Sequence, residues 1–412
     1  VLTMSHLIGL DLGTTTVTGV LLDSESGKVL RLARRRNDAA HSEPTPLNAV
    51  ERACPTRAER ACSTRAERAC STRAEQGAVR LHALVLEVLA ELAAEHTAVD
   101  GISVTGQKHG LLCVDAAGRP LTPLISWQDQ RTAEPLEGTG LTTLDEIHAR
   151  LDDLNWQEHG CRIAHGYGAA TLFWLIQQGE LPEATYSVCT IAGWLAGQLV
   201  ERAPATDPTF AASWGIYSLA DDSWNAAFLD RLGIPAQLLP PILPSCEVLG
   251  GLAPEVARQV GLASGLPVFN ALGDTQASFL GACLPRQGTP LEPTLPDRDK
   301  LAERTLSQRS ADDLSEVIFL NIGTGGQVCW VAPQFEPPTG AVETRPLLPG
   351  RYLRVGASLC GGEAYAWLNR TVRAWLSEFG ADLDEDTVYE RLNALAGECE
   401  TGRGLRVRTT FL

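Results

Sequence analysis

The sequence has no apolar stretch long enough to cross a membrane, and its first residues do not combine a basic start with an apolar run and a cleavage site. We therefore expect neither membrane insertion nor secretion. Positive charge is also scarce, because 34 Lys and Arg stand against 50 Asp and Glu, for a formal net charge of −16. This balance disfavours binding to nucleic acid or anionic lipid. We expect a cytoplasmic protein.

None of the eleven cysteines forms a Cys-x-x-Cys pair, and their spacings fit neither a disulfide framework nor a zinc site. We expect free thiols in a reducing compartment. The chain's 412 residues fit two domains, which we place at 1–264 and 265–412. Short apolar runs alternate with amphipathic helical segments such as 78–94 and 170–178, and this alternation predicts an α/β fold.

Two segments of the chain give little information about fold or function. Three near-identical octads, each beginning with Glu, predict an insertion over 51–75 that is solvated, partly helical and without function. A stretch over 285–314, rich in Pro, Arg, Asp and Ser, predicts a long exposed loop. It separates apolar strands at 266–272 and 317–322, which we assign to the same C-terminal domain.

Residues 7–22 predict a strand, a tight turn and a second strand. Gly13 permits unusual backbone angles in the turn, Thr14 and Thr15 offer donors to phosphate oxygens, and Asp11 is placed to face a magnesium ion. The segment is neither a P-loop nor a Rossmann fingerprint. An ordinary hairpin with Thr-rich edges is the alternative.

Residues 317–330 repeat this arrangement, with Gly323, Thr324 and Gly325 in the turn. Two such hairpins, one in each domain, can hold a polyphosphate from both sides of a cleft. The pair is more specific for phosphate binding than either hairpin alone.

An apolar strand ends in Gly273 and Asp274 just before a helical run. Asp274 has two interpretations, which the sequence leaves open. It could cap the helix, or it could act as the general base that takes a proton from an attacking hydroxyl.

A further polar group follows two other apolar strands. Its mixed donors, acceptors and indole ring suit a polyhydroxylated ligand. The candidates for substrate binding in this group are Gln107, His109, Gly110, Trp127 and Asp129, and Asp207 is a separate candidate. Taken singly, His109 could instead be a structural histidine, Trp127 a core residue, and Asp129 a partner of Arg131 in a surface ion pair.

In their order along the chain, these motifs resemble the FGGY carbohydrate kinases. The resemblance implies a two-domain actin-like (ribonuclease H-like) ATPase fold, with ATP and Mg²⁺ as cofactors. It also implies that Asp274 is the catalytic base, and that Asp11 and Asp274 approach the metal directly or through water. Segments 166–175, 211–215 and 357–362 are similar to the sedoheptulose kinases of this family, and xylulose kinases share the framework.

The implied reaction is ATP-dependent phosphorylation of a ketose at a primary hydroxyl, with sedoheptulose giving its 7-phosphate. Xylulose or another sugar of the family is the alternative acceptor, and a homodimer is an open alternative for assembly. Lys108 departs from the Met that ketose kinases usually carry before His-Gly. The chain also stops before the family's Gly-rich adenosine motif, which predicts an incomplete second domain.

Three rival functions follow. A noncatalytic sugar or nucleotide sensor could use the same fold, since fold does not fix function. A chaperone-type or filament-forming ATPase would keep the phosphate hairpins without needing the 107–110 segment. The missing C-terminal motif predicts a noncatalytic remnant.

Overall fold

A computed structural model describes residues 6–41, 73–94, 98–136, 140–160, 162–283, 314, 317–322, 326–340, 342–358 and 362–398 of the chain. The predicted octad insertion and the predicted 285–314 loop lie almost entirely outside these residues. Gly323, Thr324 and Gly325 lie outside them as well.

The first sheet is mixed and has the order β12-β13-β6-β1-β2-β3, with β14 also paired to β6. Its strands are β1 (His6–Leu12), β2 (Thr16–Asp23), β3 (Lys28–Arg36), β6 (Gly101–Gly106), β12 (Val248–Gly251), β13 (Pro267–Phe269) and β14 (Leu272–Gly273). β1 and β2 form an antiparallel hairpin, whereas β6 is parallel to β1, and β13 and β14 are parallel to β6. Three parallel strands, β1, β6 and β14, therefore end at the same edge of the sheet.

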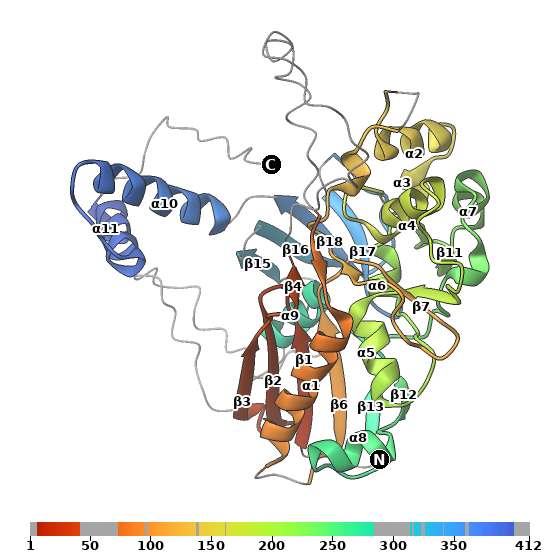
Figure 1. The fold of residues 1–412 in the computed structure, drawn as a ribbon, viewed down its shortest axis with the longest axis horizontal. Helices are drawn as coiled ribbons and strands as arrows, with labels where there is room; N and C mark the ends of the chain where they lie inside the picture. The colour runs from red at the N-terminus through yellow and green to blue at the C-terminus, as the bar shows by residue number, and fades with distance from the viewer. Residues whose placement is uncertain are drawn as a thin grey trace, which may run out of the picture.

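Helices α1 (Ala78–Ala93), α5 (Ile191–Leu199) and α8 (Pro254–Val260) share one buried core with this sheet. Apolar residues of α1 recur every three or four positions and are buried, so the helix presents one continuous apolar face. Figure 1 shows α1 lying across the strands at the start of the chain. Gly19 allows this close approach, because a Cβ there would lie 2.4 Å from Val88 Cγ1.

Residues 111–239 build a second, largely helical core around Phe173, Trp214 and Phe228. The elements of this region are β7 (Leu112–Val114), β8 (Leu124–Ile125), a 3-10 turn (Arg131–Ala133), α2 (Thr143–Leu151), α3 (Trp156–His159), α4 (Gly168–Gln177), β9 (Ser187–Cys189), α6 (Pro208–Ala212), β10 (Tyr217–Ser218), β11 (Ser223–Trp224), α7 (Ala226–Leu232) and a second 3-10 turn (Ala236–Leu238). The short strands β4 (Ala40–His41) and β5 (Glu75–Gln76) join β8 in a small sheet.

A second large sheet is antiparallel and has the order β15-β16-β18-β17. Its strands are β15 (Ile318–Ile322), β16 (Gly326–Ala332), β17 (Val342–Leu348) and β18 (Arg351–Ser358). Phe279 of α9 (Asp274–Cys283) packs into the core of this sheet. Two further helices, α10 (Gly362–Glu378) and α11 (Glu385–Glu398), contact each other (Figure 1).

The assignment of two apolar strands to one C-terminal domain stays a prediction. The strands predicted at 266–272 and 317–322 do not share a sheet, because β13 and β14 pair with β6 of the first sheet while β15 pairs with β16 of the second. Sequence order does not reveal which sheet an apolar strand joins. The strand pairings favour a domain boundary after α9, and this division of the chain is our proposal.

Within the described ranges, none of the helices combines the length and the apolar character that a membrane span requires.

Candidate functional site

The register of the parallel strands brings the predicted chemical groups to one edge of the first sheet. Leu12 pairs with Gly106, and Gly106 pairs with Gly273. Asp11, the 107–110 segment and Asp274 therefore lie at or beyond neighbouring strand ends. Partial burial raises the pKa of Asp11, and the nearby charge of Asp274 raises it further. The structure thus brings the two predicted metal-facing carboxylates together.

The turn of the β1–β2 hairpin is held by a residue that sequence reasoning missed. Asn37 donates its side-chain amide to the carbonyls of Gly13 and Thr14 over 3.2 and 3.0 Å, and its backbone N–H donates to Thr15 O. A Cβ at Gly13 would lie 2.9 Å from Thr16 O, which explains the need for glycine in this turn. The second predicted phosphate turn lies outside the described residues, although its flanking strands pair in register from Ile318 to Ile322.

Asp274 is the first residue of α9, and its side chain is 44% exposed. Oδ1 accepts a hydrogen bond from the adjacent Thr275 N–H over 2.6 Å. A helix N-cap instead precedes the helix and accepts from an amide two or three residues further on. The geometry therefore differs from that of an N-cap and leaves a partly exposed carboxylate at the strand end.

The side chain of Lys108 contacts the first turn of α9. Its side chain is 4% exposed, and its Nζ lies 3.4 Å from Asp274 Oδ1 and donates to Thr275 Oγ1 over 2.8 Å. Burial lowers the pKa of Lys108 to about 8.

His109 is held in an uncommon conformation, with a φ of 72°. Its Nδ1 lies 2.6 Å from Ser213 O, and because a carbonyl only accepts, Nδ1 carries the hydrogen. Burial first, and then the charges of Lys108 and Arg345, hold the pKa of His109 well below its usual value. The ring stacks on Tyr167 with centroids 4.1 Å apart. A neutral His109 presents Nε2 as an acceptor for a ligand hydroxyl.

Gln107, Gly110 and Trp127, predicted to bind substrate, make contacts within the protein. Gln107 donates to Gln76 Oε1 over 2.9 Å, while its own Oε1 is buried without a partner among the described residues. A Cβ at Gly110 would lie 2.8 Å from Ile125 O, so glycine is needed there for packing. Trp127 donates its indole N–H to Thr14 Oγ1 over 3.0 Å and thereby contacts the turn of the β1–β2 hairpin.

Asp129 and Asp207, predicted to bind substrate, are buried in structural networks. The carboxylate of Asp129 is fully buried and accepts from Ala74 N–H and from the Arg131 backbone and guanidinium. The predicted Asp129–Arg131 pair is therefore present, but it is buried and does not lie on the surface. Both carboxylate oxygens of Asp129 have partners within the protein, which favours a structural role, and the predicted sugar contact stays a prediction.

Asp207 caps α6 by accepting from Phe210 N–H, and it also accepts from the Thr209 and Ser245 hydroxyls. Asp207 is fully buried, and its predicted role in substrate binding stays a prediction. Thr209 Oγ1 in turn accepts from Gly273 N–H over 2.8 Å. Asp207 thus supports the backbone that leads into Asp274.

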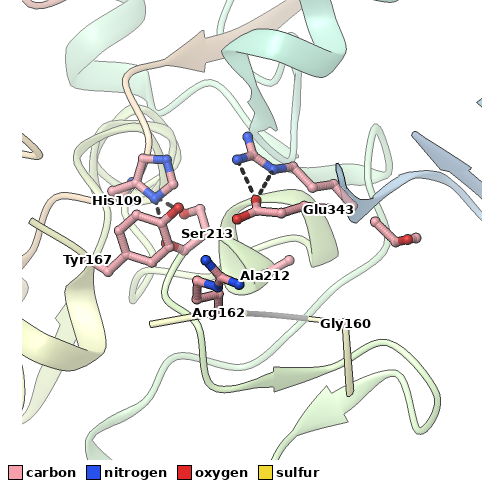
Figure 2. Close-up of a pocket in the computed structure, with 9 residues that line it drawn as sticks. His109, Gly160, Arg162, Tyr167, Ala212, Ser213 and Glu343 are labelled. Carbon is pink, nitrogen blue, oxygen red and sulfur yellow. Dashed lines mark hydrogen bonds and ion pairs between the residues drawn. The ribbon is translucent and has the colours of Figure 1, made fainter. Parts of the chain in front are cut away.

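A small recess beside His109 is lined both by residues of the N-terminal part of the chain and by residues of β17 in the second large sheet (Figure 2). His109, Tyr167 and Ser213 line one side, and Glu343 and Arg345 of β17 line another. The Arg345 guanidinium pairs with Glu343 over 2.8 Å. Sequence reasoning missed Tyr167 and Arg345, because neither belongs to a polar motif.

The carboxylates of Asp11 and Asp274 suit a magnesium ion that binds together with a polyphosphate. Asp11 and Asp274 bring two negative charges close together, which a divalent cation would offset. Among the described residues no group of three or more His, Cys, Asp or Glu side chains could hold a metal alone. Mg²⁺ commonly uses one or two carboxylates together with substrate phosphates.

The sequence and the structure are both similar to those of known carbohydrate kinases. Residues 56–281 match the FGGY family of carbohydrate kinases, N-terminal domain. Sedoheptulokinase from Homo sapiens is 28% identical over 409 residues, covering 93% of this chain and 73% of the relative. A glycerol kinase from Shewanella oneidensis is 29% identical over 50% of this chain and 41% of its own length. The structure of xylulose kinase from Rhodospirillum rubrum superimposes with a TM-score of 0.69, at 23% identity, over 96% of this chain and 68% of that one.

Proposed function

Since the chain belongs to the FGGY family of carbohydrate kinases, we propose that it transfers the γ-phosphoryl group of ATP to a primary hydroxyl of a ketose, with sedoheptulose as the preferred acceptor. The arrangement of Asp11 and Asp274 at neighbouring strand ends beside the β1–β2 hairpin carries this proposal, because it puts a base next to the turn that we propose binds phosphate. The similarity to sedoheptulokinase over 93% of the chain supports the choice of sugar.

In the proposed mechanism, Asp274 takes the proton from the acceptor hydroxyl while that oxygen bonds to the γ-phosphorus and the bond to ADP breaks. Backbone and hydroxyl donors of the 13–15 turn hold the phosphates in line with the acceptor. Asp11 and Asp274 would hold Mg²⁺, which neutralises charge on the phosphates when it is bound. Neutral His109 accepts a hydrogen bond from a sugar hydroxyl at Nε2 and so orients the sugar.

Xylulose is the second candidate acceptor. Xylulose kinases occur among the relatives and among the similar structures, including one from Lactococcus lactis that is 23% identical over 91% of this chain. The two ketoses share the reacting hydroxymethyl chemistry and differ in chain length.

The test is ADP release from Mg-ATP with sedoheptulose, xylulose, ribulose and glycerol in parallel. The proposal predicts sugar-dependent turnover with the highest kcat/KM for sedoheptulose. A higher value for xylulose would reassign the substrate and keep the reaction. ADP release that does not depend on any of these acceptors would contradict a ketose kinase activity.

A further inference from the structure

The ammonium group of Lys108 is buried among partners that all lie in the first turn of α9. It lies 3.4 Å from Asp274 Oδ1, 2.8 Å from Thr275 Oγ1 and 3.4 Å from Gln276 Oε1. A buried ammonium is strongly unfavourable unless it is paired and hydrogen-bonded, so this arrangement depends on the Asp274 carboxylate.

The site is shaped to admit this side chain. A Cβ at Gly273 would lie 2.9 Å from Lys108 Cδ, so glycine at the end of β14 leaves room for the lysine stem. Thr275 links the two charges, because its hydroxyl accepts from Lys108 and also lies 3.2 Å from Asp274 Oδ1, to which it donates.

The two oxygens of Asp274 are therefore not equivalent. Oδ1 contacts the Lys108 ammonium, the Thr275 N–H and the Thr275 hydroxyl, whereas Oδ2 receives no hydrogen bond from the described residues. The Asp274 side chain as a whole is 44% exposed, so a ligand can approach it.

We propose that Lys108 is a positioning residue for the base, holding Asp274 Oδ1 so that Oδ2 faces the acceptor hydroxyl. This inference rests on the proposed sugar kinase function. It assigns Lys108 no contact with the sugar or the nucleotide. Loss of the ammonium should therefore slow the chemical step and leave the binding of both substrates nearly unchanged.

The same contacts also predict an effect on protein stability, which is independent of catalysis. Asp274→Asn removes the charge that offsets the buried ammonium, so it should destabilise the protein when Lys108 is present. When Lys108 is replaced by Met, Asp274→Asn no longer leaves an unpaired charge and should cost much less. A double-mutant cycle measures this coupling without any activity assay.

The experiment compares wild type, Lys108→Met, Asp274→Asn and the double variant, with Lys28→Met as the matched control on the exposed side of β3. We expect Lys108→Met to lower kcat about tenfold or more, with KM for sugar and ATP within about twofold. We expect Asp274→Asn to lower the melting temperature by about 5 °C, and by much less in the Lys108→Met background. If Lys108→Met does not fold, Lys108→Gln replaces it in the same cycle.

Two results would overturn the inference. One is unchanged kcat in the Lys108 variant of a wild-type enzyme that turns over sugar. The other is additive effects on the melting temperature. Absence of sugar-dependent turnover in the wild type would instead contradict the proposed function itself, and the thermal cycle would still measure the Lys108–Asp274 pair.

Discussion

The indole N–H of Trp127 donates to Thr14 Oγ1 over 3.0 Å, and this hydrogen bond joins the sugar side of the site to the turn that we propose binds phosphate. The two residues are 113 positions apart in the sequence. We therefore expect Trp127 to help orient the β1–β2 turn.

Trp127→Phe keeps an aromatic ring and removes the hydrogen bond to Thr14. A net loss of about 1 kcal/mol should reduce kcat/KM for ATP about fivefold. Trp224→Phe is the matched control, because Trp224 donates to Pro240 O over 3.0 Å in another region. Steady-state kinetics of both variants tests this, and equal effects on ATP would exclude a specific role for Trp127.

Asn37→Ala should loosen the 13–15 turn, because its side-chain amide bonds Gly13 O, Thr14 O and Gln76 Oε1. We expect a loss of stability of about 1 to 3 kcal/mol together with a raised KM for ATP. Asn225→Ala is the control, since Asn225 caps α7 and should affect stability alone. Chemical denaturation and ATP titrations separate the two effects. An unchanged KM for ATP in Asn37→Ala would contradict the assigned role.

The sequence predicted the α/β class, the β1–β2 hairpin and the helix near 78–94, and the structure confirms them. Local periodicity was sufficient there, because burial alternates along β1 and recurs every three or four residues in α1. The actin-like fold implied by the resemblance is confirmed by the similar kinase structures.

The roles of Asp129 and Asp207 could not be predicted in the same way. A carboxylate after a strand can face a ligand, solvent or its own backbone, and only distant partners decide which. For Asp129 one partner is the N–H of Ala74, 55 residues away, and Asp207 accepts from Ser245, 38 residues away. Tyr167 and Arg345 were missed because only the tertiary structure brings them to His109.

Burial raises the pKa of Asp207 from near 3.8 to about 6. Between these values the folded protein holds the proton more tightly than the unfolded chain does. The contribution of this group to stability is therefore greatest at low pH, falls as pH rises, and is constant above about pH 6.

Asp207→Asn removes this titration. We expect the unfolding free energy of wild type, relative to Asp207→Asn, to rise by about 1 kcal/mol between about pH 7.5 and about pH 5. Urea unfolding of both proteins at the two pH values measures the difference. A constant difference, or one that shrinks on acidification, would contradict the raised pKa of Asp207.

His109 should be neutral at about pH 6.5, where an ordinary imidazole is half protonated, with its hydrogen on Nδ1, because its pKa is held well below its usual value. Nitrogen chemical shifts from a histidine-labelled sample report this directly, and His109→Gln assigns the signal. A ring that carries hydrogen on both nitrogens at that pH would rule out Nε2 as the proposed acceptor.

The central claim is that Asp274 is the base for phosphoryl transfer to a ketose. We would follow ³¹P NMR of Mg-ATP and sedoheptulose with wild type, Asp274→Asn and the exposed control Asp230→Asn, after verifying by thermal unfolding that each protein is folded. The account predicts a sugar phosphate ester from wild type and Asp230→Asn, and a rate about 10² to 10⁴ lower from Asp274→Asn. Full-rate ester formation by Asp274→Asn would contradict the account.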